Sequence, residues 1–209
     1  MRTTTTPTAH TRREHAAAIR LRILDAALEC LVESGFAEAS TLKIQERAGV
    51  SRGGLLHHFP SRESLLVAAA QHLASSRVTE TATSAAAAIT AAPDDPERVD
   101  QAIDHMWVRF QEPYFWAAVE LWVAALHHPA LRTVLRPAER ELGARIRTVV
   151  DGLFGPVLSA RPEYSALREM LLTSMRGVAL TYAFEPRVPR YERNLGVWRQ
   201  IAHVALDPR

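Results

Sequence analysis

Histidines stand as adjacent pairs at two places in this chain of 209 residues, His57–His58 and His127–His128. Imidazole binds metals and transfers protons near neutral pH. Neighbouring side chains on a helix point in different directions, however, so neither pair readily holds one metal ion, and no HExxH spacing occurs. Cys30 is the only cysteine, which excludes an intrachain disulfide and a cysteine-bound metal cluster. Because GxxxxGK[ST] and GxSxG motifs are absent too, we expect no catalytic site, no metal and no cofactor.

A second set of side chains fits nucleic acid. The run Ser51-Arg52-Gly53-Gly54 joins a hydroxyl and a guanidinium to two glycines. The arginine fork matches O6 and N7 of guanine in the major groove, so Arg52 is the best candidate for a base contact. Each glycine in a helix costs about 0.8–1 kcal/mol relative to alanine. Either the missing side chains let the helix start approach a phosphate or groove edge, or packing tolerates the glycines.

Other polar residues nearby suit contacts with the DNA backbone. Lys43 and Arg62 are placed to bind phosphates, which positions a protein on DNA without specifying the sequence. His57 and His58 are candidates for phosphate hydrogen bonds. For His58 the alternative is packing against the following helix.

The elements that must position these side chains are helices. Apolar residues recur every three or four positions in the first segment, which predicts a helix over about 13–34 that ends at Gly35. Ser40 or Thr41 is the N-cap of a second, short helix that reaches Ala48, and Ser51 caps a third over 52–58. Prolines and glycines separate longer helical segments, at 62–92, 96–111, 113–127, 130–152, 162–184 and 190–206. The pattern predicts an all-α fold of about nine helices.

The turn Ala48-Gly49-Val50-Ser51 supplies a small residue, a glycine able to take a positive φ, and a β-branched residue that plugs the core between two helices. With its flanking segments, this region resembles the DNA-binding domain of the TetR family of bacterial transcriptional regulators. About 50 residues carry the resemblance: Ile23-Leu24-Asp25-Ala26-Ala27, Gly35-Phe36, Ser40/Thr41, Ile44, Ala48-Gly49-Val50-Ser51, His58-Phe59 and Ser61-Arg62-Glu63-Ser64-Leu65-Leu66.

The resemblance implies a helix-turn-helix with its third helix in the major groove, and a homodimer bound to a palindromic operator on double-stranded DNA. It implies phosphate contacts from Ser40, Thr41 and Arg62. The recognition-helix stretch then comprises Ser51, Arg52, Gly53, Gly54, His57 and His58. Two departures stand out. Leu42 lies where base readers of the family are basic, and Leu56 lies where many members carry a tyrosine.

The distribution of charge points to the same region. The chain has 25 basic and 23 acidic residues; residues 1–66 hold nine basic and seven acidic, whereas residues 67–209 hold sixteen of each. Residues 1–11 are polar and threonine-rich, and we predict a flexible basic arm there. We hypothesise that Arg2, Arg12 and Arg13 lie along phosphates or reach the minor groove. The alternative is a tail without a binding role.

Aromatic residues gather between positions 107 and 122, on two consecutive predicted helices. One interpretation is an apolar pocket for a planar or hydrophobic effector, and the alternative is a plain core. Glu120 and Arg176 stand on otherwise apolar helices, where they either pair with each other or hold the polar group of a ligand. The candidate pocket residues are Met106, Trp107, Phe110, Phe115, Trp122 and Arg176.

The last two helices carry apolar faces, and in the TetR family such a pair forms a four-helix dimer interface with its symmetry mate. The candidate interface residues are Leu171, Val178, Tyr182, Leu195, Trp198 and Ala202. A monomer would keep these faces for its own core.

The sequence thus predicts a flexible arm over 1–11, a helix-turn-helix domain over 12–66, and an effector-binding and dimerisation domain over 67–209. Its longest alanine-rich stretch falls far short of the roughly 20 apolar residues of a membrane span. We expect a cytoplasmic, sequence-specific regulator without a membrane partner, a repressor released from its operator by a small apolar or aromatic effector. The alternatives are a helical enzyme that binds a small molecule and an adaptor that does not bind DNA.

Overall fold

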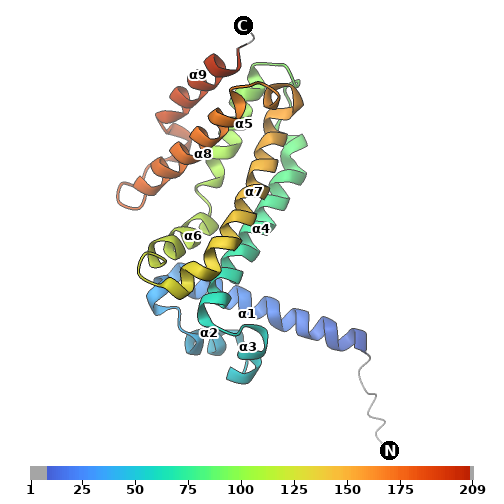
Figure 1. The fold of residues 1–209 in the computed structure, drawn as a ribbon, viewed down its shortest axis with the longest axis vertical. Helices are drawn as coiled ribbons and strands as arrows, with labels where there is room; N and C mark the ends of the chain where they lie inside the picture. The colour runs from blue at the N-terminus through green and yellow to red at the C-terminus, as the bar shows by residue number, and fades with distance from the viewer. Residues whose placement is uncertain (1–8, 208–209) are drawn as a thin grey trace, which may run out of the picture. The chain divides into compact units, whose positions relative to one another are not determined.

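The computed structural model describes residues 9–207, except for the side chains of residues 9–12 and 85–88. Over this range the chain forms nine α-helices, one short 3-10 helix and no strand (Figure 1), which confirms the all-α prediction. None of the described helices is both long and apolar enough to cross a bilayer. The helices are α1 (Ala9–Glu38), α2 (Thr41–Ala48), α3 (Arg52–His58), α4 (Arg62–Ala88), α5 (Glu97–Arg109), α6 (Pro113–Ala124), α7 (Pro129–Ser159), α8 (Tyr164–Thr181) and α9 (Asn194–Leu206), with the 3-10 helix at Pro189–Tyr191.

Two glycines interrupt the longest helices where the sequence predicts a break. Gly35 has φ 72 and ψ 175, so the regular part of α1 ends after residue 34 and one further turn reaches Glu38. Gly155 has φ 80 and lies in the break predicted between Gly152 and Pro156, although α7 continues to Ser159 beyond it. A Cβ on Gly155 would lie 2.9 Å from Nε of Arg98, whose Nε–H also binds the Phe154 carbonyl at 2.8 Å. Both backbone conformation and space therefore require glycine at this position.

The first helix begins earlier than predicted, because residues 9–11 already belong to α1. Residues 1–8 of the predicted arm, with Arg2, and the side chain of Arg12 lie outside the described residues. Arg13 is exposed on α1.

The chain divides into two compact units. The first unit takes the chain through Leu73 together with Trp116–Glu139, so α6 and the first part of α7 join the three N-terminal helices. The second unit takes Ala74–Phe115 and the chain from Arg140 onward. Helices α4 and α7 therefore each contribute residues to both units.

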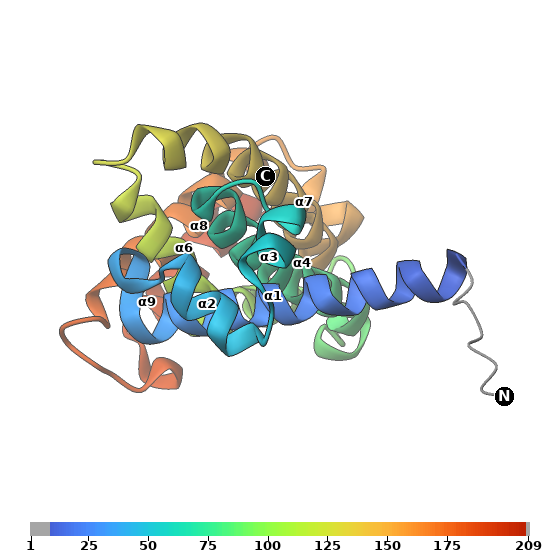
Figure 2. The same ribbon diagram turned by 90° about the horizontal axis from the view of Figure 1, so that it is seen from below.

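One apolar core holds the first unit together. Its fully buried members include Leu31 of α1, Ile44 of α2 and Leu55 of α3, and Leu121 of α6 and Leu131 of α7 complete it. Figure 2 shows α2 and α3 lying across α1. The short helices bury little area themselves, so their positions depend on this shared core.

In the second unit, α5 and α8 both pack against α9. The indole rings of Trp107 and Trp198 meet at 5.2 Å between centroids. Each indole nitrogen has a partner, since Trp107 Nε1 donates to the Pro189 carbonyl at 2.9 Å and Trp198 Nε1 donates to Ser174 Oγ at 2.8 Å. These two tryptophans hold α5 and α8 to the last helix.

Candidate functional site

Two serine caps and one glycine shape the segment from α2 to α3. Oγ of Ser40 accepts a hydrogen bond from Lys43 N at 3.2 Å, and Oγ of Ser51 accepts one from Gly54 N at 3.1 Å. Gly49 adopts the left-handed conformation, with φ 63 and ψ 41, and its N–H donates to the Glu46 carbonyl. Glycine adopts this conformation without the steric penalty of a side chain, so α2 can end sharply. The predicted helix-turn-helix is present.

A buried leucine on one side of α3 determines which residues of this helix face outward. Leu55 is 1% exposed and anchors the helix in the core of the first unit. Arg52, Gly53, Leu56 and His57 are exposed as a consequence, with Leu56 at 45%. These four residues form an outward face that combines one cation, an imidazole and an apolar side chain, and we call it the α3 face.

Gly53 has no packing reason to be glycine within the described protein. A Cβ built on Gly53 has no atom within 4 Å, whereas one on Gly54 would lie 3.4 Å from Oγ of the capping Ser51. The 3.4 Å contact is an ordinary van der Waals distance, so packing requires glycine at neither position, and the open space at Gly53 leaves room for close approach of a ligand surface.

His58 is half-buried beside the α3 face. Its ring lies 6.5 Å from that of Phe59 and 5.4 Å from that of His57. The His58 ring therefore lies beside those of its two chain neighbours, while His57 is exposed.

The two exposed cations of α2 both have acidic partners. Nζ of Lys43 lies 2.7 Å from Glu38 Oε2, and Nη2 of Arg47 lies 2.7 Å from Glu33 Oε2. The hydrogen bond from Lys43 lowers the pKa of Glu38. Exposed pairs of this kind contribute little to stability, so Lys43 can exchange Glu38 for another anion at small cost. Thr41 is half-buried and Leu42 is 57% exposed.

Arg62 at the start of α4 uses its guanidinium inside the first unit. Nε donates to the Ala39 carbonyl at 2.9 Å, and Nη2 donates to the Phe36 carbonyl. The guanidinium also lies over the Phe36 ring, 4.2 Å from its centroid. Arg62 thus satisfies carbonyls in the turn that follows Gly35, and burial lowers its pKa without removing its charge.

A contact with α6 completes this turn. The Phe36 N–H donates to Glu120 Oε2 at 3.2 Å, and the Phe36 ring lies 5.1 Å from that of His128. Glu120 is exposed rather than buried. Sequence reasoning missed this contact, because the two residues are 84 positions apart and no local pattern relates them.

Two arginines of α1 also support the helix-turn-helix from within. Nη2 of Arg22 donates to the Ala48 carbonyl at 3.2 Å, which caps the end of α2. The Arg20 guanidinium lies 5.0 Å from the Phe59 ring centroid. Arg20 and Arg22 therefore help to hold α2 and α3 in place.

Replacing the serine caps tests this description of the turn. We expect Ser40→Ala and Ser51→Ala each to lower the free energy of unfolding by about 1 kcal/mol, because each leaves a helix N–H without its acceptor. Urea unfolding followed by circular dichroism measures the loss. Ser159→Ala, at the far end of α7, is the control, and an equal loss there would contradict a specific capping role.

Similarity to known proteins extends beyond this segment. A family model described as bacterial regulatory proteins, tetR family, matches residues 23–69. Over 192 residues the chain is 30% identical to the HTH-type transcriptional regulator CymR of Pseudomonas putida, and the alignment covers 90% of each chain. The chain belongs to the TetR family. It is a DNA-binding transcriptional regulator and not an enzyme.

Solved structures share the TetR-type fold. A transcriptional regulator from Rhodococcus sp. Rha1 aligns with a TM-score of 0.66 at 21% identity, over 91% of this chain and 98% of that chain. FadR from Bacillus subtilis, solved in complex with stearoyl-CoA, aligns with a TM-score of 0.61 at 16% identity, over 90% and 97%. At these identities the likeness shows the fold alone.

Three aromatic residues of the predicted TetR effector pocket meet in the second unit. Phe110 is half-buried, and its ring lies 6.4 Å from Trp107 and 5.5 Å from Phe115, both buried. Met106 is buried on α5, the helix that also carries Trp107. Trp122 is part of the first unit, packed against its core, and Arg176 is exposed on α8.

The predicted interface residues of α8 and α9 lie mostly inside the protomer. Leu171, Leu195, Trp198 and Ala202 are each at most 9% exposed, because these sides of the helices pack together and against α5. Val178 and Tyr182 are half-buried, and the Tyr182 hydroxyl donates to Glu192 at 2.8 Å. The four buried residues, Leu171, Leu195, Trp198 and Ala202, therefore expose little surface to a second copy of the chain.

Proposed function

We propose that this TetR-family regulator is a homodimeric repressor that binds a palindromic DNA operator in the cytoplasm and is released by a small apolar or aromatic effector. Residues 12–66 bind DNA in this proposal, and residues 67–209 bind the effector and the partner subunit. The observation that carries it is the α3 face, an exposed arginine beside a glycine with open space around it.

We assign the base contact to Arg52. It is exposed at the N-terminal end of α3, where a guanidinium reaches the edge of a guanine. Gly53 then allows the helix backbone to approach the groove, and the exposed Leu56 suits the methyl group of a thymine. The α3 face therefore combines polar and apolar readout.

Phosphate contacts surround this face in the proposal. Ser40, Thr41 and Lys43 at the start of α2 bind one stretch of the DNA backbone. Further phosphate contacts come from Ser51, Gly54, His57 and His58. Arg62 differs from these residues, because its guanidinium already binds the carbonyls of Phe36 and Ala39. We infer that Arg62 positions the helix-turn-helix instead of binding DNA.

The partner subunit binds on the exposed sides of α8 and α9. On α9, Val197, Ile201 and Val204 are 49%, 43% and 70% exposed and recur at helical spacing. On α8, Leu180 is 38% exposed, and a Cβ on Gly177 has no atom within 4 Å, so another helix can approach closely there. A second copy of the chain fits best, since a palindromic operator requires a two-fold dimer.

Acidic substitutions on α9 test the dimer. We expect the double variant Ile201→Asp/Val204→Asp to be monomeric at micromolar concentration, because it buries four carboxylates in the two-fold interface. Size-exclusion chromatography with light scattering measures the mass. Val123→Asp, at a residue 58% exposed on α6, is the matched control and is expected to stay dimeric. A dimeric double variant would place the interface elsewhere.

Effector release follows from a shift between conformations. An effector that binds better to a dimer with wrongly spaced recognition helices lowers operator affinity, and a coupling of about 1–3 kcal/mol changes it about 5- to 150-fold. Helix α4 is the proposed lever because it contributes residues to both units. Deletion of the gene should raise transcription from the promoter that the protein binds. A fall in transcription would identify an activator.

A further inference from the structure

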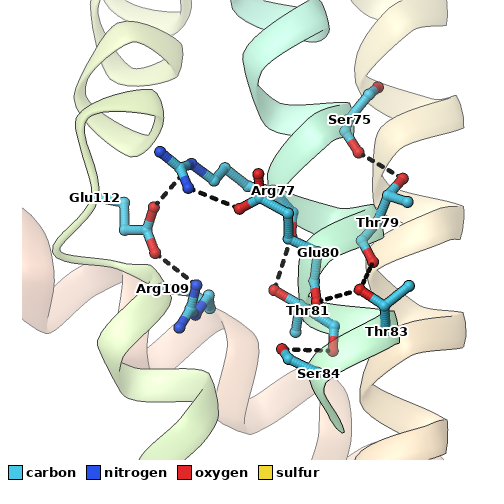
Figure 3. Close-up of polar contacts among 9 residues, drawn as sticks. All are labelled: Ser75, Arg77, Thr79, Glu80, Thr81, Thr83, Ser84, Arg109 and Glu112. Atoms are coloured by element: carbon cyan, nitrogen blue, oxygen red, sulfur yellow. Dashed lines mark hydrogen bonds and ion pairs between the residues drawn. The ribbon is translucent and has the colours of Figure 1, made fainter.

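A polar cluster lies in the second unit where α5 ends. Nη1 of Arg109 lies 2.6 Å from Glu112 Oε1, and Nε of Arg77, on α4, lies 3.3 Å from Glu112 Oε2. Figure 3 shows the Glu112 carboxylate between the two guanidinium groups. We call His105, Arg109, Gln111 and Glu112, together with Arg77, the α5-end cluster.

Three buried nitrogen atoms of this cluster have no hydrogen-bond partner among the described residues. They are Nε2 of His105, Nε of Arg109 and Nε2 of Gln111. Folded proteins leave very few buried polar atoms unpaired, because an unmade bond to a desolvated donor is costly. Three such atoms within seven residues indicate a place that receives a molecule bearing hydrogen-bond acceptors.

The unused groups of the cluster are hydrogen-bond donors. Both oxygens of Glu112 already have guanidinium partners, so the unused atoms are nitrogens. Glu80 also pairs with Arg77, at 2.7 Å, so the two arginines balance the two carboxylates. What the cluster lacks is therefore an acceptor for its N–H groups, and carboxylate oxygens are strong acceptors.

The neutral groups can act as donors as well. Burial, and then the neighbouring Arg109, lowers the pKa of His105, so its imidazole is neutral near pH 7 and can present an N–H at Nε2. Burial, and then the Glu112 carboxylate, raises the pKa of Tyr114 to about 12, so its phenol keeps its proton.

Aromatic side chains lie next to these donors along the chain. Phe110 stands between Arg109 and Gln111 and is half-buried, in ring contact with Trp107 and Phe115. A ligand held at its polar end by the cluster can therefore place a flat apolar body against Phe110.

Resting on the proposed effector-controlled function, we propose that the α5-end cluster is the polar end of the effector site and binds a carboxylate carried by an aromatic ring. The Nε edge of Arg109 and the Gln111 amide bind the carboxylate oxygens, and Phe110 packs against the ring. The expected class of effector thus becomes aromatic carboxylates, which is narrower than apolar or aromatic molecules in general.

Calorimetric titration of the full-length protein tests the ligand class. The probes are benzoate and 2-naphthoate, each paired with its neutral amide, benzamide and 2-naphthamide. We expect the carboxylates to bind about tenfold more tightly than the amides, because bonds to an ionised acceptor are the stronger. Amides that bind as tightly as the carboxylates, or carboxylates that do not bind, would overturn the proposal.

Variants then tie the preference to the cluster. Arg109→Lys keeps the positive charge beside Glu112 and removes the Nε donor, and Gln111→Met removes a donor without a change of charge. We expect each to lower carboxylate affinity about tenfold and to leave amide affinity within about twofold. Arg199→Lys is the matched control, because Nε of Arg199 is also buried without a hydrogen bond, but it lies 4.0 Å from Asp100 Oδ1 and its guanidinium pairs with Asp104.

Wild-type carboxylate affinity in Arg109→Lys would overturn the site, as would an equal loss in Arg199→Lys. Operator binding without any probe is measured in the same preparations. A protein that binds its operator but shows no carboxylate preference contradicts this inference alone, whereas a protein that binds no operator contradicts the proposed function.

Discussion

Arg52→Ala is expected to abolish recognition of the operator while leaving the fold intact. A bidentate contact between arginine and guanine contributes about 1–3 kcal/mol of discrimination, so two half-sites lose about 2–6 kcal/mol, or at least about 30-fold in affinity. Arg52 is exposed, and its guanidinium contacts no carboxylate in the part of the chain that the structure describes. Helicity and the free energy of unfolding should therefore not change. Fluorescence anisotropy with operator and unrelated DNA measures both affinities.

Unrelated DNA serves as the internal control for Arg52, since non-specific affinity depends on phosphate contacts. Arg132→Ala, at an exposed arginine of α7 in the same unit, controls for the loss of one positive charge. If the Arg52→Ala protein still prefers its operator over unrelated DNA as the wild type does, Arg52 does not read the sequence.

Arg62→Met is expected to destabilise the first unit by about 2–3 kcal/mol, because hydrogen bonds from a charged donor contribute about 1.5–3 kcal/mol each and this site is half-exposed. The substitution leaves the carbonyls of Phe36 and Ala39 without their donor and uncovers the Phe36 ring. Urea unfolding measures the loss, and Arg132→Met, at an exposed site, should change stability by less than about 0.5 kcal/mol. An Arg62→Met protein as stable as the wild type would contradict the positioning role.

The salt dependence of DNA binding separates a positioning role of Arg62 from a phosphate contact. Two lost phosphate contacts, one per protomer, would lower the slope of log K against log salt concentration by about 1.8. We expect the slope to be unchanged in Arg62→Met under conditions where the variant is folded. A slope reduced by that amount would assign Arg62 to the DNA backbone.

The sequence predicts those parts of the fold that local chemistry determines. Serines and glycines announce the helix caps, and Gly49 and Gly35 take the positive φ that only glycine adopts easily. The start of α1 at Ala9 was not predicted, since its first residues carry no apolar periodicity. Helix number and class follow from the pattern, whereas exact ends vary by several residues.

Tertiary partners were beyond sequence reasoning. Arg62 looks like a surface cation in the sequence, and only the structure brings it to the carbonyls of Phe36 and Ala39. The apolar spacing of α8 and α9 predicts a buried face, but cannot say whether the protomer or its partner buries it. Leu171 and Trp198 are buried in the protomer, and Val204 on the other side of α9 is exposed.

Selection of bound sequences from a random DNA library by the full-length protein tests whether a dimer reads a defined operator. We expect a palindrome whose half-sites lie about one helical turn apart, each with a guanine that Arg52→Ala no longer selects. Footprinting should then show two protected stretches on one face of the duplex. Failure to enrich any sequence would contradict a sequence-specific regulator, and enrichment of a single unrepeated site would contradict the dimer.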